Sequence, residues 1–321
     1  MSEEIKNMKK IELHFHLDGA VALSTISKIS GRTEEDLKKE MVAPEKCENL
    51  SDYLKRFDLP LSYMQTKENL TLIAKETVDY LESQNVIYAE IRFAPMFHTK
   101  EGLTYNEIID AVLEGLKSNE NVKTNLILCM MRGFPKEDSI KTLEVAREYL
   151  GYGVCAVDIA GAEDQYPLGL YEELFKLARE KFVPFTIHAG ENESHKEVDL
   201  AISLGAKRIG HGIHSNESLE TQVRLKEKKV LLEMCPTSNV QTNAIQVYEN
   251  HPIQFFLDHG VRVCVNTDNK TVSGITLNEE YEKLQKVFGF TMEDFKRMNI
   301  YAAEGAFLPW DEKEELKQQL N

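Results

Sequence analysis

The stretch VCAVDIAG, residues 154–161, is nearly continuous in apolar residues instead of alternating, as expected of a parallel strand covered on both faces. Seven other short β-rich runs occur along the chain. They are KIELHFH (10–16), VIYAEIRF (86–93), KTNLILCMM (123–131), PFTIHAG (184–190), RIGHGI (208–213), VLLEMCP (230–236) and VRVCVNTD (261–268). Several of these are also nearly continuous in apolar residues, so the sequence predicts eight mainly parallel strands.

Amphipathic stretches lie between these runs, and each is long enough for a crossover helix. They span 105–118, 137–150, 170–181, 196–204, 218–228 and 252–259. From the second run to the eighth, the starts are about 22 to 37 residues apart, which is the length of a repeating βα unit in a parallel sheet. Eight such units predict an α/β fold of the closed (β/α)8 type, a TIM barrel, whose usual size is ~250 residues.

The chain has 321 residues, so about 70 of them lie outside such a barrel. We expect extra helices after the first strand, over 23–75, and at the C-terminus, over 277–320. No Ser/Gly-rich linker or repeat interrupts the sequence, so we treat residues 1–321 as a single domain. An open doubly wound sheet uses the same alternation, but its dinucleotide-binding form needs G-x-G-x-x-G after the first strand. LHFHLDGAVAL lacks that motif, so the closed barrel is the better prediction.

The composition is that of an ordinary soluble globular protein, with 42% hydrophobic and 28% charged residues. The 38 basic and 53 acidic residues give a formal net charge of −15. This charge argues against nucleic acid as a partner, because phosphate backbones are bound chiefly by Lys and Arg. No apolar run approaches the ~20 residues that cross a bilayer, and MSEEIKNMKK at the N-terminus lacks an export segment. We therefore expect a cytoplasmic protein with no membrane partner, while the oligomeric state stays open.

The C-terminal ends of the predicted strands are unusually polar, and functional residues cluster at these ends in a barrel of this kind. The polar residues there are His14, His16, His188, Glu191, His211, Asp268 and Asn269. His14 and His16 are two apart on one strand, so both side chains point to the same face. An H-x-H pair alone is a weak signal, because buried hydrogen-bonded histidines and surface histidines show it too. A third histidine and Asp268 at other strand ends complete a set suited to zinc and related divalent metals.

Hydrolysis is the natural reaction class for such a site, because a catalytic zinc leaves room for water and lowers its pKa. Glu191 lies three residues after His188, where a carboxyl group could transfer a proton to or from a substrate. It could equally be a solvated loop residue. His211, between two glycines, could orient or deprotonate the water, or it could be a packed histidine that holds a neighbouring carbonyl group.

Six motifs, in order along nearly the whole chain, are similar to those of one known family. They are ELHFHLDGA (12–20), VDIAGAE (157–163), TIHAGE (186–191), RIGHGIHS (208–215), EMCPTSNVQT (233–242) and VNTDNKTVS (265–273). On these motifs the chain resembles the adenosine deaminases of the metal-dependent amidohydrolase superfamily. The resemblance implies a (β/α)8 enzyme with one Zn²⁺ per chain at its mouth. It also implies the hydrolysis of adenosine and 2′-deoxyadenosine to inosine or deoxyinosine and ammonia, in purine salvage.

The resemblance implies a role for each matching residue. The implied zinc ligands are His14, His16, His188 and Asp268. Glu191 matches the catalytic residue that protonates purine N1, and His211 matches the one that positions the attacking hydroxide and helps to take its proton. Asp18 and His16 resemble the residues near the ribose 5′-hydroxyl, and the N–H of Gly161 resembles the donor to purine N3. Because Glu191 must be protonated at the start, we expect a closed pocket to raise its pKa.

Asn269 departs from the pattern of most members, which have a second Asp at this position to bond purine N7. An Asp must be protonated to donate, whereas the Asn amide donates as it stands. We therefore expect Asn269 to bind substrate, with some effect on which 6-aminopurine fits best.

Residues 50–58 (LSDYLKRFD) resemble the helix that covers the pocket in the family. Their apolar members Leu50, Tyr53, Leu54 and Phe57 have i, i+3, i+4, i+7 spacing. A lid with this apolar underside would exclude water, and an ordinary amphipathic helix packed on the barrel is the plainer alternative.

Deamination of adenine or of a modified adenosine on the same barrel is the alternative activity. AMP would need a cationic phosphate site, and the motifs contribute little beyond Lys270. Adenine deaminases of the family carry H-L-E-G where this chain has H-L-D-G at 16–19, so Asp18 favours a nucleoside. A non-catalytic zinc-binding barrel is less favoured, because Glu191, His211 and every implied metal ligand are present. The expected partner is a small-molecule purine nucleoside.

Overall fold

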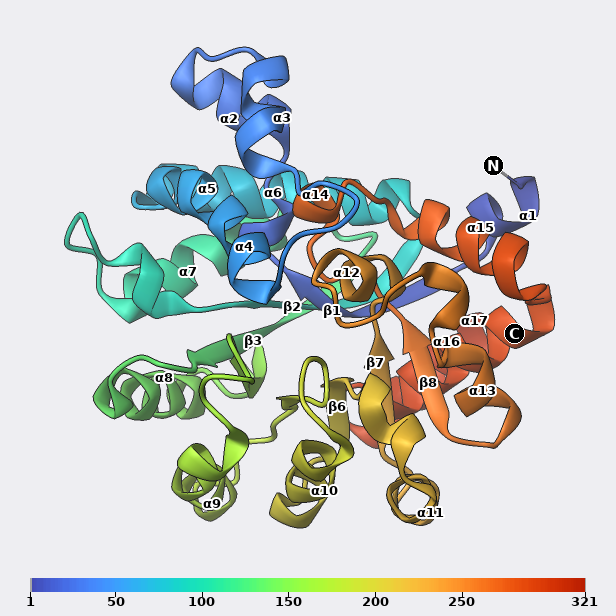
Figure 1. Ribbon diagram of the computed structural model, residues 1–321. Coiled ribbons are helices and arrows are strands. Elements are labelled where there is room, and N and C mark those ends of the chain that lie inside the picture. Colours follow the sequence, from blue (N-terminus) through green and yellow to red (C-terminus); the bar gives the residue numbers. More distant parts are fainter. Residues whose placement is uncertain (1, 321) are drawn as a thin grey trace.

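Eight strands alternate with helices along the chain, in a computed structural model that describes residues 2–320 (Figure 1). The strands are β1 (Lys10–His16), β2 (Val86–Phe93), β3 (Lys123–Met131), β4 (Val154–Ala160), β5 (His188–Ala189), β6 (Arg208–His211), β7 (Leu231–Met234) and β8 (Arg262–Val265). They form two four-stranded sheets in sequence order, β1-β2-β3-β4 and β5-β6-β7-β8. Every pairing between neighbours is parallel. Each of the eight predicted runs therefore contains a strand.

The two sheets join into a ring at both of their seams. Phe15 of β1 forms a parallel bridge to Asp268, just after β8. The N–H of Asp268 also donates to the carbonyl of His14 over 3.0 Å. At the other seam, Val157 of β4 forms a parallel bridge to Phe185, just before β5. The fold is therefore the predicted (β/α)8 barrel.

Helices follow the strands and cover the outside of the ring (Figure 1). They include α6 (Lys67–Ser83), α7 (Tyr105–Leu116), α8 (Lys136–Glu148), α9 (Glu172–Glu180), α10 (His195–Leu204), α11 (Leu219–Glu227), α13 (Ile253–Asp258) and α16 (Met292–Gly305). In α7, Ile108, Ile109 and Val112 share one buried face, and a capping box between Thr104 and Glu107 begins the helix. The six predicted amphipathic stretches agree with α7 to α11 and α13 to within two residues at each end.

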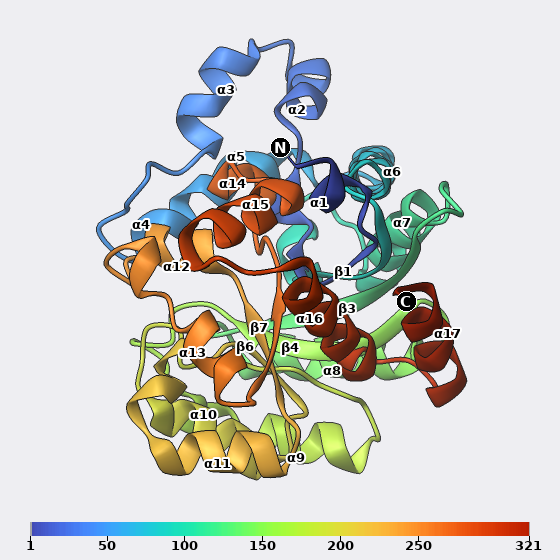
Figure 2. The ribbon, with the colours of Figure 1, turned by 90° about the vertical axis from the view of Figure 1, so that its right-hand side faces the viewer.

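Extra helices occupy both regions where the sequence predicts them. After β1 come α2 (Leu23–Ser30), α3 (Glu34–Met41), α4 (Leu50–Leu54), a 3₁₀ turn (Lys55–Phe57) and α5 (Asp58–Tyr63). After β8 come α14 (Lys270–Ser273), α15 (Leu277–Phe288), α16 and α17 (Trp310–Leu320). Figures 1 and 2 show that α2 and α3 project from the barrel, whereas α16 and α17 lie against it near the C-terminus. Asn299 of α16 accepts the N–H of Ile11 over 2.8 Å, so α16 is bonded to β1 and covers the seam between β8 and β1.

Charged side chains fill part of the barrel interior, which the apolar character of the runs does not predict. Arg92 Nη1 lies 2.8 Å from Asp158 Oδ2, and Arg92 Nη2 lies 2.8 Å from Glu233 Oε2. Arg208 pairs with Glu233 through Nε over 2.7 Å, and it also pairs with Glu90. All five side chains are fully buried, and such charges are tolerated because each is paired. The pairs connect β2, β4, β6 and β7 across the ring.

The fifth strand departs most from its predicted boundaries. The run at 184–190 contributes only His188–Ala189 as regular strand. Pro184 has no N–H to donate, and its carbonyl accepts the N–H of Val157 over 3.0 Å. The strand therefore begins as an isolated bridge and becomes regular only at the end that carries His188.

Within residues 2–320, no helix is long and apolar enough to cross a membrane. The predicted domain limits of 1–321 include Met1 and Asn321, which lie outside the described residues. The single domain and the cytoplasmic location stay predictions.

Candidate active site

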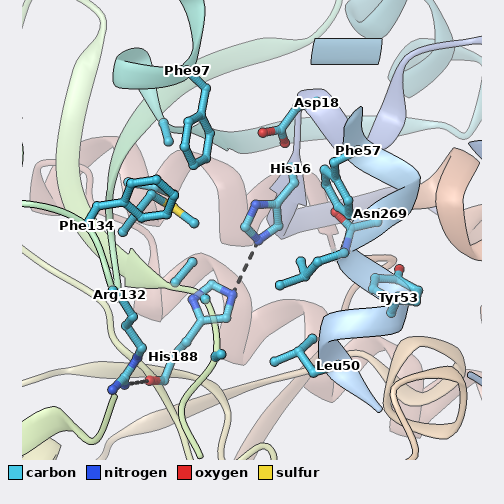
Figure 3. Close-up of a pocket in the computed structure, with 18 of the residues that line it drawn as sticks. His16, Asp18, Leu50, Tyr53, Phe57, Phe97, Arg132, Phe134, His188 and Asn269 are labelled. Atoms are coloured by element: carbon cyan, nitrogen blue, oxygen red, sulfur yellow. Dashed lines mark hydrogen bonds between the residues drawn. The ribbon is translucent and has the colours of Figure 1, made fainter. Parts of the chain in front are cut away.

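Four side chains with metal-binding atoms converge at the C-terminal mouth of the barrel. His14 and His16 come from β1, His188 comes from β5, and Asp268 follows β8. Their ligand atoms all lie within 4.8 Å of one another. The Nε2 atoms of His16 and His188 are 3.3 Å apart (Figure 3). Asp268 Oδ1 lies 3.3 Å from Nε2 of His14 and 3.4 Å from Nε2 of His16.

This donor set fits a zinc-type ion. Zinc bonds imidazole nitrogen at about 2.0–2.1 Å, which places tetrahedrally arranged ligand atoms roughly 3.3–3.4 Å apart. The three distances given above have this spacing. Nε2 of His14 is buried and makes no hydrogen bond to any described residue, as expected of a nitrogen reserved for a metal. Three imidazoles and one carboxylate can therefore hold a divalent cation.

Two of these histidines face buried carboxylates on their other ring nitrogen. His14 Nδ1 lies 2.8 Å from Glu233 Oε2, and His188 Nδ1 lies 2.8 Å from Asp158 Oδ2. The hydrogen bond from His14 Nδ1 to Glu233 keeps the ring proton there, so Nε2 presents its lone pair to the metal and the ring keeps its orientation. His188 Nδ1 meets Asp158 at ion-pair distance, and that negative charge likewise favours a proton on Nδ1. The sequence patterns do not predict a role for either carboxylate at the metal site. The signal was an acidic residue inside an otherwise apolar strand run, in VDIA and in LLEM.

His211 has a tautomer that a chain of hydrogen bonds determines. The backbone N–H of Ile253, which can only donate, bonds Nδ1 of His251 over 3.2 Å. Burial lowers the pKa of His251 to about 3 and that of His211 well below its usual value, so both rings are neutral near pH 7. The proton of His251 therefore sits on Nε2, which donates to Asn239 Oδ1 over 3.2 Å. Asn239 Nδ2 then donates to His211 Nδ1 over 3.0 Å, so His211 carries its own proton on Nε2.

Glu191 is buried beside this histidine. Its Oε1 accepts the hydroxyl of Thr242 over 3.2 Å, and its Oε2 lies 3.6 Å from His211 Nε2. Burial, together with the carboxylate of Asp268, raises the pKa of Glu191 to about 8. The direction is the one expected from the sequence, and it leaves Glu191 protonated near neutral pH, able to donate.

The other predicted substrate-binding residues lie around the same space. Burial raises the pKa of Asp18 to about 7, although the N–H of Gly19 donates to its Oδ1 over 3.1 Å. Gly19 also makes room for Asn269, because a Cβ on Gly19 would lie 2.0 Å from Asn269 Oδ1. Gly161 follows β4 with a φ of +107°, a left-handed backbone that favours glycine. Asp18, Gly161 and Asn269 all line one cavity with His16.

That cavity has a volume of about 540 Å³. The predicted covering segment 50–58 lines it, with Leu50, Tyr53, Leu54 and Phe57. Figure 3 shows Leu50, Tyr53 and Phe57 on one side and Phe97 and Phe134 on the other. The segment is not one helix, however, because α4 ends at Leu54 and the 3₁₀ turn separates it from α5. The apolar side chains of both walls enclose the polar groups at the barrel mouth.

A parallel (β/α)8 barrel with three histidines and one aspartate converging at the strand ends is the architecture of a metal-dependent hydrolase. The chain belongs to the adenosine deaminase family, whose model, described as adenosine deaminase, matches residues 9–321.

Relatives and solved structures agree with this assignment. The chain is 42% identical over 327 residues to the adenosine deaminase of Enterococcus faecalis, covering 99% of this chain and 97% of the relative. It is 41% identical to that of Clostridium perfringens, covering 97% of each. The crystal structure of adenine deaminase from Arthrobacter aurescens is similar, with a TM-score of 0.88, 25% identity and 98% of each chain covered. A Burkholderia ambifaria amidohydrolase with bound Zn shares the fold, with a TM-score of 0.88, 21% identity, and 100% and 92% covered.

Proposed function

We propose that this chain catalyses the hydrolytic deamination of adenosine and 2′-deoxyadenosine, which releases ammonia and leaves inosine or deoxyinosine, in purine salvage. The observation that carries the proposal is the convergence of His14, His16, His188 and Asp268 beside a buried Glu191, whose pKa burial raises to about 8, in one cavity. The curated relatives named above support the same reaction.

One Zn²⁺ per chain is the cofactor that we propose for the four converging ligands. When bound, the ion lowers the pKa of water, so that hydroxide is available near neutral pH. Glu233 and Asp158 orient two of the ligand rings through Nδ1. These carboxylates prepare the site before a metal or substrate enters it.

Proton transfer to the purine is the role that we propose for Glu191. With a pKa of about 8, its carboxyl group carries the proton that N1 needs when the nucleophile adds at C6. Protonation of N1 neutralises the charge that develops as the ring loses aromaticity. His211 presents an N–H at Nε2, so it holds the attacking oxygen by donating a hydrogen bond to it. The other half of the role that the resemblance implies, taking the proton of that oxygen, would need the opposite tautomer.

Substrate orientation comes from polar groups spread around the cavity. Asn269 donates its amide N–H to purine N7, and the N–H of Gly161 donates to N3. Asp18 and His16, which line the cavity, bind the ribose 5′-hydroxyl in this proposal. The apolar side chains of α4 and the 3₁₀ turn exclude water from the reacting atoms.

Metal analysis combined with initial rates tests this proposal. We expect stoichiometric zinc and ammonia release from adenosine and 2′-deoxyadenosine at rates above those for adenine and AMP. Preferred turnover of adenine would favour the alternative activity and contradict the role of Asp18. Stoichiometric zinc without ammonia release from any adenine derivative would overturn the enzyme assignment.

A further inference from the structure

Glu163, just after β4, accepts hydrogen bonds from four consecutive backbone N–H groups. Its Oε1 accepts from Gly190 over 2.6 Å, and its Oε2 accepts from Glu191 over 3.0 Å. Oε2 also accepts from Asn192 and from Glu193, each over 3.2 Å. Glu163 is only 2% exposed, and a carboxylate has about four acceptor positions. The four N–H groups of residues 190–193 therefore occupy its acceptor positions.

That turn, 190–193, connects β5 to α10 and cannot bond its own N–H groups as a helix or strand would. Gly190 begins it with a φ of +65°, and a Cβ there would lie 2.6 Å from Val198. The backbone direction is therefore set by a glycine in a left-handed conformation. Without Glu163, four N–H groups would lose their acceptor. The bonds from Gly190 and Glu191 are buried, and a buried donor without a partner is costly.

Arg132, a cation, bonds the end of β5, just before the turn. Its Nη2 donates to the carbonyl of His188 over 2.8 Å (Figure 3), and its Nη1 donates to the carbonyl of Tyr166 over 2.6 Å. A cation thus holds the carbonyl of His188 while an anion holds the N–H groups that follow it. The two side chains restrain the path of the chain from the metal ligand to Glu191.

The side chain of Glu191 is buried but has few polar contacts that fix the direction of its carboxyl group. Among residues 2–320, the one hydrogen bond to this carboxyl group comes from Thr242 over 3.2 Å, and His211 Nε2 is 3.6 Å away. The direction of its carboxyl group therefore depends on the position of its backbone, and the backbone N–H of Glu191 donates to Glu163. Misplacement of a catalytic group by about 1 Å can cost ~10²-fold in rate.

We propose that Glu163 is a positioning residue that aims Glu191 at purine N1 by holding the turn 190–193. The idea rests on the proposed deamination. Glu163 is the last residue of the VDIAGAE motif, but the sequence assigned it no role.

Glu163→Gln is the decisive variant, because it keeps the shape but replaces one acceptor oxygen with an NH₂ donor that opposes the backbone N–H groups. We expect kcat for adenosine to fall roughly 10²-fold, with KM changed less than about 3-fold and zinc content unchanged. Peptide-level hydrogen exchange of the 190–193 amides should become faster in the variant. Glu163→Asp, which keeps both acceptor oxygens, should restore part of the lost kcat.

The matched control is Glu197→Gln. Glu197 also accepts a backbone N–H, from Leu168 over 2.7 Å, and lies 4.0 Å from Arg132, but it does not bond the turn. We expect its kcat to stay within about 3-fold of the parent. A loss in the control equal to that of Glu163→Gln would overturn the proposal, because any change near Arg132 would then suffice.

Three other results would overturn it: an unchanged kcat in Glu163→Gln, a loss of zinc, or a loss expressed in KM. If Glu163→Gln does not fold, hydrogen exchange of the 190–193 amides in the parent enzyme tests the proposal instead. Amides 190–193 that exchange as fast as an exposed loop would contradict the hydrogen bonds themselves. A parent enzyme that releases no ammonia would refute the proposed function instead, and the exchange result would still stand.

Discussion

Asn239 donates from Nδ2 to Nδ1 of His211 over 3.0 Å, and this contact decides which ring nitrogen of His211 carries the proton. His251 orients the amide from its other side, through Asn239 Oδ1 at 3.2 Å. His211 therefore offers a donor at Nε2 near Glu191, and a lone pair at that nitrogen would require the amide to turn over.

Asn239→Asp should reverse this arrangement. A carboxylate can only accept a hydrogen bond, so the proton of His211 would move to Nδ1 and Nε2 would present a lone pair instead of an N–H. A wrong tautomer of this kind can cost up to ~10⁴-fold in kcat. We expect at least a ~10²-fold loss, with the proton shift visible in the ¹⁵N resonances of His211. Asn121→Asp, on the surface, serves as the control. Unchanged or higher kcat in Asn239→Asp would show that His211 acts as a base.

The rate should fall at high pH because Glu191 loses its proton. Burial and the carboxylate of Asp268 raise the pKa of Glu191 to about 8, and the protonated form is the one that donates. The active form is therefore present below about pH 8 and is lost as the pH rises through the pKa. A kcat profile between about pH 6 and pH 10 measures this limb.

Glu191→Gln is the companion variant for that profile. It should keep zinc and fold but lose roughly 10²- to 10⁴-fold in kcat, and its residual rate should lack the high-pH limb. Near-normal turnover in this variant would remove Glu191 from the proposed role.

Asp158→Asn should weaken metal retention. The substitution removes the charge that lies 2.8 Å from His188 Nδ1, and loss of such an outer partner typically costs 10–100-fold in metal affinity. Competition against a chelator measures the change. Asp199→Asn provides the control, because Asp199 pairs with Arg224 and not with a metal ligand. Equal zinc retention in both variants would contradict the orienting role of Asp158.

Gly19→Ala should displace Asn269. The new Cβ would lie 2.0 Å from Asn269 Oδ1, so the amide must move away from the position proposed for purine N7. Loss of that hydrogen bond should lower kcat/KM for adenosine roughly 10- to 100-fold. Gly169→Ala is the control, because nothing lies within 4 Å of its Cβ position. Normal kcat/KM in Gly19→Ala would exclude Asn269 from substrate binding.

Much of the barrel follows from the sequence by itself. The largely apolar runs 86–93 and 123–131 coincide with β2 and β3 residue for residue, because strands covered on both faces are mainly apolar. The spacing of the runs predicts the βα repeat, and His14, His16, His188 and Asp268 stand at strand ends where a barrel gathers its chemistry.

The tertiary structure alone decides which groups hold these residues in place. Glu233 lies 219 residues from His14, and Glu163 lies far enough from Glu191 that no helical or strand periodicity relates them. The periodicity of a sequence shows on which face of its helix or strand a residue lies. It does not show which residue it contacts across the barrel, because that contact depends on how the ring closes. When the ring closes, Glu233 comes within hydrogen-bond distance of His14, and Glu163 comes within hydrogen-bond distance of the turn that carries Glu191. Each buried carboxylate therefore has partners, which it holds in place, and is not an unpaired charge.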